Sequence, residues 1–178
     1  MKKIISLFQR NYDTDRLIRN EVVPGAEWVI DGEGVATQKL DGTCCLVKDG
    51  ELWKRYEVKR DKTPPPGFVA ANEVDEITGK QQGWVRVGIE TENKWHREAY
   101  REPLSDGTYE LVGPKVQGNP EHFEKHTLVP HGIIHLDAPR TYDELKEWFK
   151  DKDIEGIVWH HSDGRMVKIK KKDFGYKR

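Results

Sequence analysis

The feature that most constrains the fold of this chain is a pair of β-prone segments separated by a two-residue turn. The segments Thr43–Lys48 and Glu51–Val58 are rich in strand-forming residues, and Asp49-Gly50 lies between them. An Asp-Gly pair in this position is typical of a tight β-hairpin, because both residues adopt positive φ angles at low cost. The sequence therefore predicts two adjacent antiparallel strands.

A second hairpin is predicted near the C-terminal end, where residues 154–160 and 165–170 flank a Ser-Asp-Gly turn. Side chains alternate between the two faces of a strand, so Lys168 and Lys170 are expected on one face. Three residues of the partner strand are expected to share a face in the same way: Glu155, Ile157 and Trp159.

One helix is predicted after Thr141. This residue can act as the N-cap, and Glu144 three residues later would complete a capping box. Leu145, Trp148 and Phe149 follow at helical spacing, so we expect them to form an apolar face in the core. Further strands are expected at residues 35–38, 83–89 and 108–112. The whole pattern predicts an α+β fold dominated by antiparallel strands.

The composition fits one domain over residues 1–178, with enough large aromatic side chains to form a core. The net charge of −1 does not by itself indicate a nucleic-acid-binding protein, although residues 168–178 are locally basic. No apolar run is long enough for a transmembrane helix, and no protein partner is implied. Cys44 and Cys45 are adjacent and are not expected to bridge, which predicts reduced thiols and a cytoplasmic protein.

The segment Lys39-Leu40-Asp41-Gly42 carries the most reactive combination of residues. A lysine between a strand and an Asp-Gly turn lies at the end of an element, where reactive groups are commonly presented. Gly42 would allow the backbone to approach a phosphate. An ordinary lysine, with a pKa of about 10.4, is neutral in roughly one molecule in a thousand near pH 7.4. Nearby cations are therefore needed to favour the nucleophilic form, and Lys168, Lys170 and a bound divalent metal ion could provide them.

The four-residue pattern is weak by itself, but other segments follow it in a recognisable order. They are Arg55 or Arg60, then residues 109–113, residues 155–159 and Lys168-Ile169-Lys170. The ordered set resembles the covalent nucleotidyltransferase superfamily of ATP-dependent ligases and mRNA capping enzymes. The resemblance implies an adenylation domain in which antiparallel sheets flank a nucleotide cleft.

The resemblance also implies roles for the matching residues. Lys39 would be the catalytic nucleophile, Glu110 would hold the ribose of ATP, and Glu155 would help to bind Mg²⁺ or Mn²⁺. Lys168 and Lys170 would contact the α-phosphate. The sequence does not separate Arg55 from Arg60 as the ribose- and phosphate-contacting arginine, and Arg55 is preferred. The full set implied to bind the nucleotide is Gln38, Lys39, Asp41, Gly42, Arg55, Arg60, Glu110, Lys168 and Lys170.

Within the superfamily, the chain is most similar to the small 5′-to-3′ RNA ligase family that also has a vertebrate member. The segments that carry this similarity are residues 33–45, 83–85, 94–96, 109–118 and 128–132. The implied substrates are ATP and RNA with 5′-phosphate and 3′-hydroxyl ends. Gln38 departs from the glutamate often found before the nucleophile. The chain ends just after the last motif, so we expect no additional domain that grips RNA.

Three related functions remain open: a DNA ligase, a capping-type nucleotidyltransferase and a non-catalytic RNA-binding module, in which strand aromatics would stack on bases. A protein kinase is rejected, because the kinase-like triplet Asp173-Phe174-Gly175 lies three residues from the end and no His-Arg-Asp loop exists.

Two other sites are disfavoured. A zinc hydrolase would need helical ligands among His122, His126, His131 and His135, but Pro130 and Gly132 interrupt that segment. Of these, His131 or His135 could instead lie near the nucleotide base. A Cys44 nucleophile has no support from its neighbours, and we expect this residue in the core of its strand.

Overall fold

The computed structural model describes residues 4–101 and 103–178, which form two compact units. Unit 1 contains residues 41–131, and unit 2 combines residues 4–40 with residues 132–178. The predicted domain range, 1–178, also includes residues 1–3 and 102, which lie outside the described residues. Both units consist mainly of antiparallel strands with few helices, which confirms the predicted α+β class.

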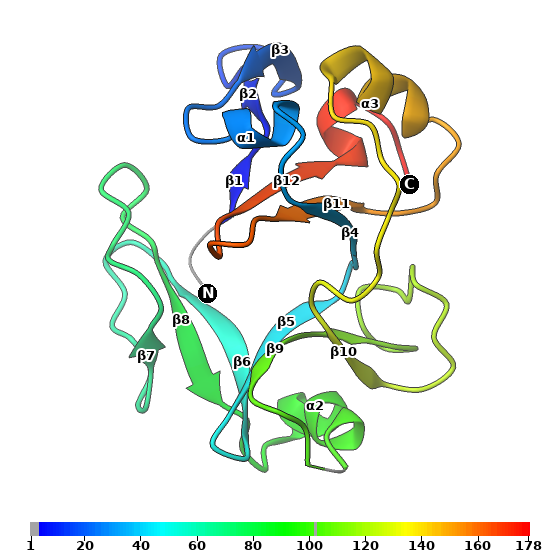
Figure 1. The fold of residues 1–178 in the computed structure, drawn as a ribbon. Helices are drawn as coiled ribbons and strands as arrows, with labels where there is room; N and C mark the ends of the chain where they lie inside the picture. The colour runs from blue at the N-terminus through cyan, green and yellow to red at the C-terminus, as the bar shows by residue number, and fades with distance from the viewer. Residues whose placement is uncertain (1–3, 102) are drawn as a thin grey trace. The chain divides into compact units, whose positions relative to one another are not determined.

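Unit 1 contains a six-stranded sheet in the order β10-β9-β5-β6-β8-β7, in which all neighbouring strands are antiparallel (Figure 1). The strands are β5 (Thr43–Lys48), β6 (Glu51–Val58), β7 (Val69–Ala70), β8 (Gln81–Arg86), β9 (Gly107–Val112) and β10 (Thr127–Pro130). A 3₁₀ helix, η1 (Thr91–Asn93), and helix α2 (Lys94–Ala99) follow β8 in the chain. The β5–β6 hairpin is confirmed, and Asp49 and Gly50 both have positive φ angles, of 53° and 73°.

The two faces of this sheet differ in character. Cys45, Val47, Tyr109 and Leu111 are buried together in one hydrophobic core. Alternation places Cys44 on the opposite face, where it is only partly buried. The expectation that Cys44 lies in the core is therefore wrong: of two adjacent strand residues only one can face the core, and packing selects Cys45.

Unit 2 contains a four-stranded sheet in the order β1-β12-β11-β4 and a separate hairpin of β2 and β3. The strands are β1 (Ile5–Ser6), β2 (Phe8–Arg10), β3 (Ile18–Val22), β4 (Val35–Lys39), β11 (Gly156–His160) and β12 (Met166–Lys170). β11 and β12 confirm the predicted C-terminal hairpin. Figure 1 shows the N-terminal β1, in blue, beside the C-terminal β12, in red-orange; this pair is parallel.

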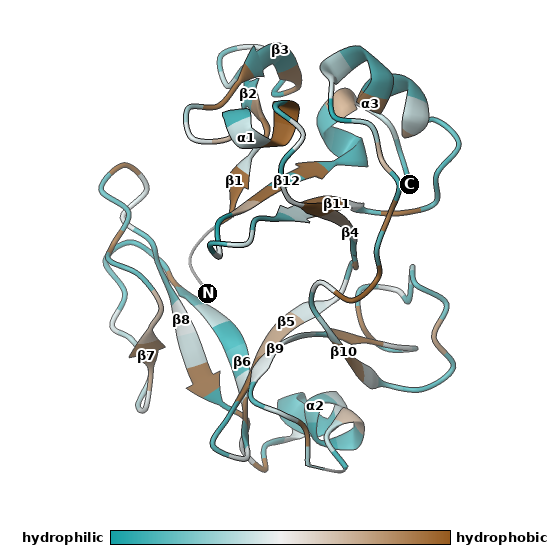
Figure 2. Ribbon diagram, in the orientation of Figure 1, coloured by the Kyte–Doolittle hydropathy of each residue, from teal (hydrophilic) through white to brown (hydrophobic). Residues whose placement is uncertain are grey.

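The core of unit 2 lies on one face of this sheet. Ile157, Trp159, Val167 and Ile169 are fully buried there, and Leu145 of α3 packs in the same cluster. The helical elements of the unit are α1 (Glu27–Ile30), α3 (Tyr142–Trp148) and the 3₁₀ helix η2 (Lys171–Phe174). α3 is mostly hydrophilic in Figure 2, and its buried residue is Leu145. No helix in the described residues is both long and apolar enough to cross a membrane.

The predicted N-cap of α3 is confirmed, but the predicted capping box is not. Thr141 is the N-cap residue, and its hydroxyl donates to the carboxylate of Glu144 at 2.6 Å. The side chain makes no hydrogen bond to a backbone N–H of the first turn. Leu145 and Phe149 are fully buried and Trp148 partly so, which confirms the predicted apolar face.

Candidate active site

The strand register of unit 2 brings three lysines onto one face of the sheet. Lys39 ends β4 and pairs with Gly156 of β11, which in turn pairs with Lys170 of β12. Lys168 lies two residues before Lys170 and therefore shares its face, as predicted. The side chain of Glu155, immediately before β11, reaches the same face. We call Lys39, Glu155, Lys168 and Lys170 the lysine–glutamate cluster.

Glu155 connects two of the lysines directly. One carboxylate oxygen accepts a hydrogen bond from Nζ of Lys39, and the other accepts one from Nζ of Lys170 at 2.5 Å. The Glu155 side chain is only 12% exposed, against 22% for Lys39 and 23% for Lys170. A single carboxylate therefore holds two ammonium groups at the end of two strands.

This arrangement corrects one prediction from strand alternation. Ile157 and Trp159 share the core-facing side as expected, but the carboxylate of Glu155 contacts lysines on the other side. Glu155 precedes the first ladder residue of β11, so the regular alternation does not fix its side chain. Gly156 is required by close packing, because a Cβ atom there would lie 2.1 Å from the carbonyl oxygen of Ile169.

The charges of the cluster shift two pKa values. Burial raises the pKa of Glu155, but the charges and hydrogen bonds of Lys39 and Lys170 outweigh it, so the net pKa is lowered and the carboxylate stays ionised. The pKa of Lys168 is lowered from 10.5 to about 8. Burial is the largest cause, and repulsion from Lys170 and Lys39 adds to it. The cluster is therefore a concentrated positive site held around one negative charge.

A buried aspartate supports the end of β12. Asp173, 3% exposed, accepts a hydrogen bond from the backbone N–H of Lys170 at 2.9 Å and another from the guanidinium of Arg10. Asp173 thus fixes the backbone of Lys170. The local sequence around Asp173 gives no sign of this role, because one of its partners is Arg10, 163 residues away in the chain.

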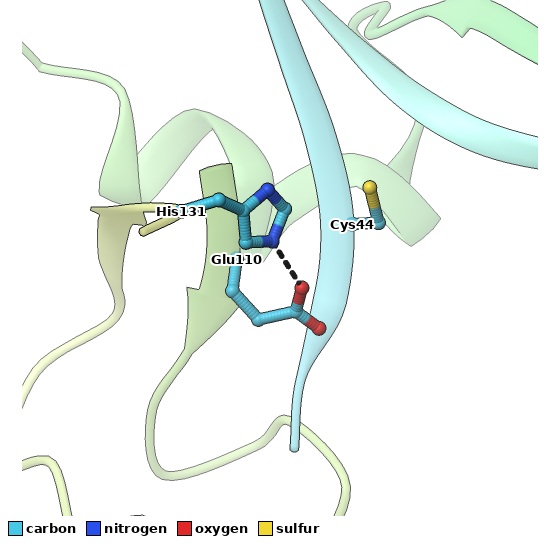
Figure 3. Close-up of side chains that lie close together, drawn as sticks. All are labelled: Cys44, Glu110 and His131. Carbon is cyan, nitrogen blue, oxygen red and sulfur yellow. Dashed lines mark hydrogen bonds and ion pairs between the residues drawn. The ribbon is translucent and has the colours of Figure 1, made fainter. Parts of the chain in front are cut away.

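A second group of predicted residues gathers on the partly exposed face of the unit 1 sheet. One oxygen of Glu110 accepts a hydrogen bond from the backbone N–H of Gly42 at 3.1 Å, and the other contacts Nε2 of His131 at 2.8 Å. Because a carboxylate only accepts hydrogen bonds, His131 donates in this contact. Figure 3 shows His131 and Cys44 on either side of Glu110. Glu110 is thereby fixed through both of its oxygens.

Asp41 and Gly42, the first described residues of unit 1, are held by contacts within that unit. The backbone N–H of Asp41 donates to the carboxylate of Glu121 at 2.7 Å. At Gly42, a Cβ atom would lie 2.2 Å from the carbonyl oxygen of Leu111, so only glycine fits without a backbone shift. Gln38 precedes Lys39 on β4, and strand alternation directs these two side chains to opposite faces.

The two candidate arginines lie in different environments. Arg55 is on β6, with its guanidinium 4.9 Å from the ring centroid of Trp84 and Nε donating to Gln82 at 3.2 Å. Arg60 lies beyond the strand and donates to the backbone carbonyls of Ile77 and Thr78, at 2.6 and 3.2 Å. Arg60 is therefore engaged in holding a surface loop, whereas Arg55 lies within the sheet that carries Glu110.

Two contact residues were not assigned these roles from the sequence. Glu121 had no recognisable motif. His131 was considered as a disfavoured zinc-hydrolase ligand and as a possible neighbour of the nucleotide base. The signal for His131 was its position directly after a β-prone segment, but its partner, Glu110, lies 21 residues earlier in the chain.

Comparison with known proteins gives consistent matches. A family model described as RNA ligase 1 matches residues 99–178. A relative from Pongo abelii named RNA ligase 1 is 30% identical over 220 residues, covering 79% of this chain and 67% of the relative. The protein of the same name from Danio rerio is 28% identical over 219 residues, covering 80% and 67%. The family-model match includes Glu110, Glu155, Lys168 and Lys170, whereas Lys39 lies before it.

Proposed function

We propose that this chain, which belongs to the RNA ligase 1 family, is an ATP-dependent RNA ligase that acts through a lysyl–AMP intermediate at Lys39. The observation that carries the proposal is the lysine–glutamate cluster. It places a lysine at the end of a strand, in contact with a partly buried carboxylate and beside two further lysines. Such a site suits a reaction in which an amine attacks a phosphate that carries several negative charges.

In the first step, Nζ of Lys39 attacks the α-phosphorus of ATP. A nitrogen–phosphorus bond forms, the bond to the leaving oxygen breaks, and pyrophosphate departs. The amine must first leave Glu155 and lose a proton. Lys168 and Lys170 lie on the same strand face as Lys39, where they can bind the phosphates of ATP. The same two ammonium groups stabilise negative charge on the phosphate oxygens in the transition state.

Glu155 is the residue that would hold Mg²⁺ or Mn²⁺. Its lowered pKa keeps it ionised, and a hard divalent cation is commonly bound by one or two carboxylates together with substrate phosphates and water. The single carboxylate of the cluster fits that donor set. Such a cation supplies charge stabilisation at the phosphate oxygens.

Glu110 is proposed to accept a hydrogen bond from the ribose of ATP. Its position is set by the N–H of Gly42 and by His131, so the carboxylate is already oriented before a ligand binds. Arg55, rather than Arg60, is proposed to contact the ribose or a phosphate, because Arg60 already binds two carbonyls of the loop between β7 and β8.

The remaining two steps transfer and release AMP. The AMP of Lys39 passes to the 5′-phosphate of an RNA, which frees the lysine and forms a phosphoanhydride. The 3′-hydroxyl of the second RNA end then attacks the activated 5′-phosphate, the phosphodiester forms and AMP leaves. Both steps place new charge on phosphate oxygens, so Lys168 and Lys170 serve them as well.

The proposal is tested by covalent labelling. The protein is incubated with α-labelled ATP and Mg²⁺ or Mn²⁺, denatured, and examined for label. Wild type is expected to retain label and Lys39→Ala none, while Lys172→Ala, which removes an exposed lysine, serves as the matched control. Glu155→Ala is expected to reduce the rate by about 100-fold or more. Full labelling of Lys39→Ala would refute the role of this residue.

The same assay separates the alternatives. A non-catalytic RNA-binding module would acquire no label from ATP in the wild-type protein. Preferential labelling by GTP would indicate capping chemistry. A panel of 5′-phosphorylated substrates then distinguishes RNA sealing, which we expect, from the sealing of nicked DNA.

A further inference from the structure

Three metal-ligating side chains of different types gather in unit 1, apart from the lysine–glutamate cluster. They are Cys44, Glu110 and His131, and one ligand atom of each lies within 4.8 Å of the other two (Figure 3). We propose that these three side chains bind a zinc-class cation, and that this cation restrains the Glu110 carboxylate. The binding itself does not depend on the proposed function.

The sheet register explains why the three side chains meet. Cys44 of β5 and Glu110 of β9 are directly paired across antiparallel strands, so their side chains share one face. β10 pairs with the other edge of β9, with Val129 opposite Glu110. His131 lies two residues beyond Val129, and its backbone N–H donates to the carbonyl of Thr108 at 3.1 Å. Its ring therefore lies on the face of Glu110.

The donor set selects the class of cation. A thiolate, an imidazole and a carboxylate are all common ligands of Zn²⁺, whereas Mg²⁺ and Ca²⁺ prefer oxygen donors alone. Three protein ligands leave a fourth tetrahedral position for water or a substrate oxygen. This site is thus chemically distinct from Glu155, the one carboxylate of the lysine–glutamate cluster.

The observed spacing is close to what such a cation requires. Zinc–ligand bonds of about 2.0–2.3 Å at tetrahedral angles place neighbouring ligand atoms roughly 3.4–3.6 Å apart. The contact of 2.8 Å between His131 and Glu110 must therefore open by less than about 1 Å. Nε2 of His131 would bind the cation without the proton that it now donates, and that proton would move to Nδ1 of the same ring. Cys44 would bind as a thiolate, so metal binding should release the proton of this thiol.

Two residues next to the proposed ligands affect cation binding: Arg55 and Cys45. Arg55 interacts electrostatically with Cys44, and its positive charge would repel a dication. Cys45 is excluded as a ligand, because it lies in the core on the opposite face and burial raises its thiol pKa. The two adjacent cysteines therefore form a matched pair, in which only Cys44 can bind.

The consequence for activity rests on the proposed function. If Glu110 holds the ribose of ATP, a cation bound to its carboxylate competes with that contact. Zinc is then expected to inhibit labelling of Lys39 even when Mg²⁺ is present. Removal of Cys44 should weaken this inhibition, although Cys44 makes no contact in the proposed reaction.

The binding is tested with cobalt(II), a spectroscopic probe for zinc sites. Titration of the reduced protein should produce a thiolate-to-cobalt charge-transfer band that saturates at one equivalent and is displaced by zinc. Cys45→Ala should retain the band. Cys44→Ala and His131→Ala should each weaken cobalt binding by about 100-fold or more, because even the loss of a residue that only contacts a metal ligand lowers metal affinity by about 10- to 100-fold. Circular dichroism establishes that each variant is folded.

The possible results distinguish the metal site itself from the proposed effect of the cation on labelling. Absence of a thiolate band in the folded wild-type protein, or its persistence in Cys44→Ala, would overturn the metal site. Inhibition is read as the ratio of labelling rates with and without zinc, within each variant. Suppose that the wild-type protein binds cobalt through Cys44 but that zinc leaves the ratio of labelling rates at one. The metal site is then supported, and the proposed effect of the cation on Glu110 is refuted. If no protein is labelled at all, the proposed function fails and the cobalt result is unaffected.

Discussion

Replacement of Lys168 by Met should stabilise the protein while it reduces the proposed activity. The ammonium group of Lys168 is desolvated and lies near Lys170 and Lys39, which lowers its pKa from 10.5 to about 8 despite partial compensation by Asp173 and Glu155. This difference corresponds to roughly 3 kcal/mol of unfavourable free energy in the folded state. Solvent screening of the partly exposed side chain reduces the expected gain to about 1–2 kcal/mol. Met retains most of the apolar stem of the lysine.

The stability that Lys168→Met gains over wild type should decrease as the pH rises. Below pH 8, Lys168 is protonated in both states and the folded protein carries the full penalty. Between pH 8 and 10.5, the unfolded chain keeps a proton that the folded protein has lost, so wild-type stability from this group rises with pH. The advantage of Lys168→Met is therefore largest near pH 7 and disappears by about pH 10.5.

Urea denaturation followed by tryptophan fluorescence measures this difference, since Trp159 is fully buried in the same unit. Lys172→Met is the control: this exposed lysine should change the free energy of unfolding by no more than about 0.5 kcal/mol. A Lys168→Met variant that is less stable than wild type at pH 7, or whose advantage does not change between pH 7 and 10, would refute the reasoning. Labelling by ATP in the same variant should fall.

Four further substitutions test other contacts. Gly42→Ala should lower stability by about 1–3 kcal/mol in thermal denaturation and impair labelling, because its Cβ would lie 2.2 Å from a carbonyl oxygen of β9; wild-type stability would argue against this close packing. Lys171→Met should lower the free energy of unfolding in urea by about 1–3 kcal/mol, whereas Lys168→Met should raise it. The reason is that the buried amine of Lys171 donates to two backbone carbonyls after α3, at 2.7 and 3.4 Å. Arg55→Ala should raise the ATP concentration needed for half-maximal labelling by about tenfold or more, whereas Arg60→Ala should leave it unchanged; the reverse result would exchange their roles.

Elements with strong local signals were predicted correctly. The β5–β6 hairpin has the predicted bounds, Thr43–Lys48 and Glu51–Val58, because Asp49-Gly50 fixes the turn and the flanking residues favour strands. The face shared by Lys168 and Lys170 was also predictable, because strand alternation is a property of the backbone alone. Both predictions use information within a few residues of the chain.

Contacts between distant segments were not predictable in the same way. The parallel pair of β1 and β12 joins the two ends of the chain and has no turn to mark it. The carboxylate of Glu155 lies on the lysine face because packing directs it there, outside the regular ladder. Cys44 faces Glu110 and Cys45 faces the core, although both are equally compatible with a strand.

The sequence by itself determined the hairpins, the apolar face of α3 and the order of the motifs, since each depends on residues close together in the chain. Only the tertiary structure decided which carboxylate meets which basic side chain. The contact of Lys39 with Glu155 spans 116 residues and that of Glu110 with His131 spans 21. Such contacts arise from strand pairing and burial, whose free energies depend on the whole fold rather than on local sequence.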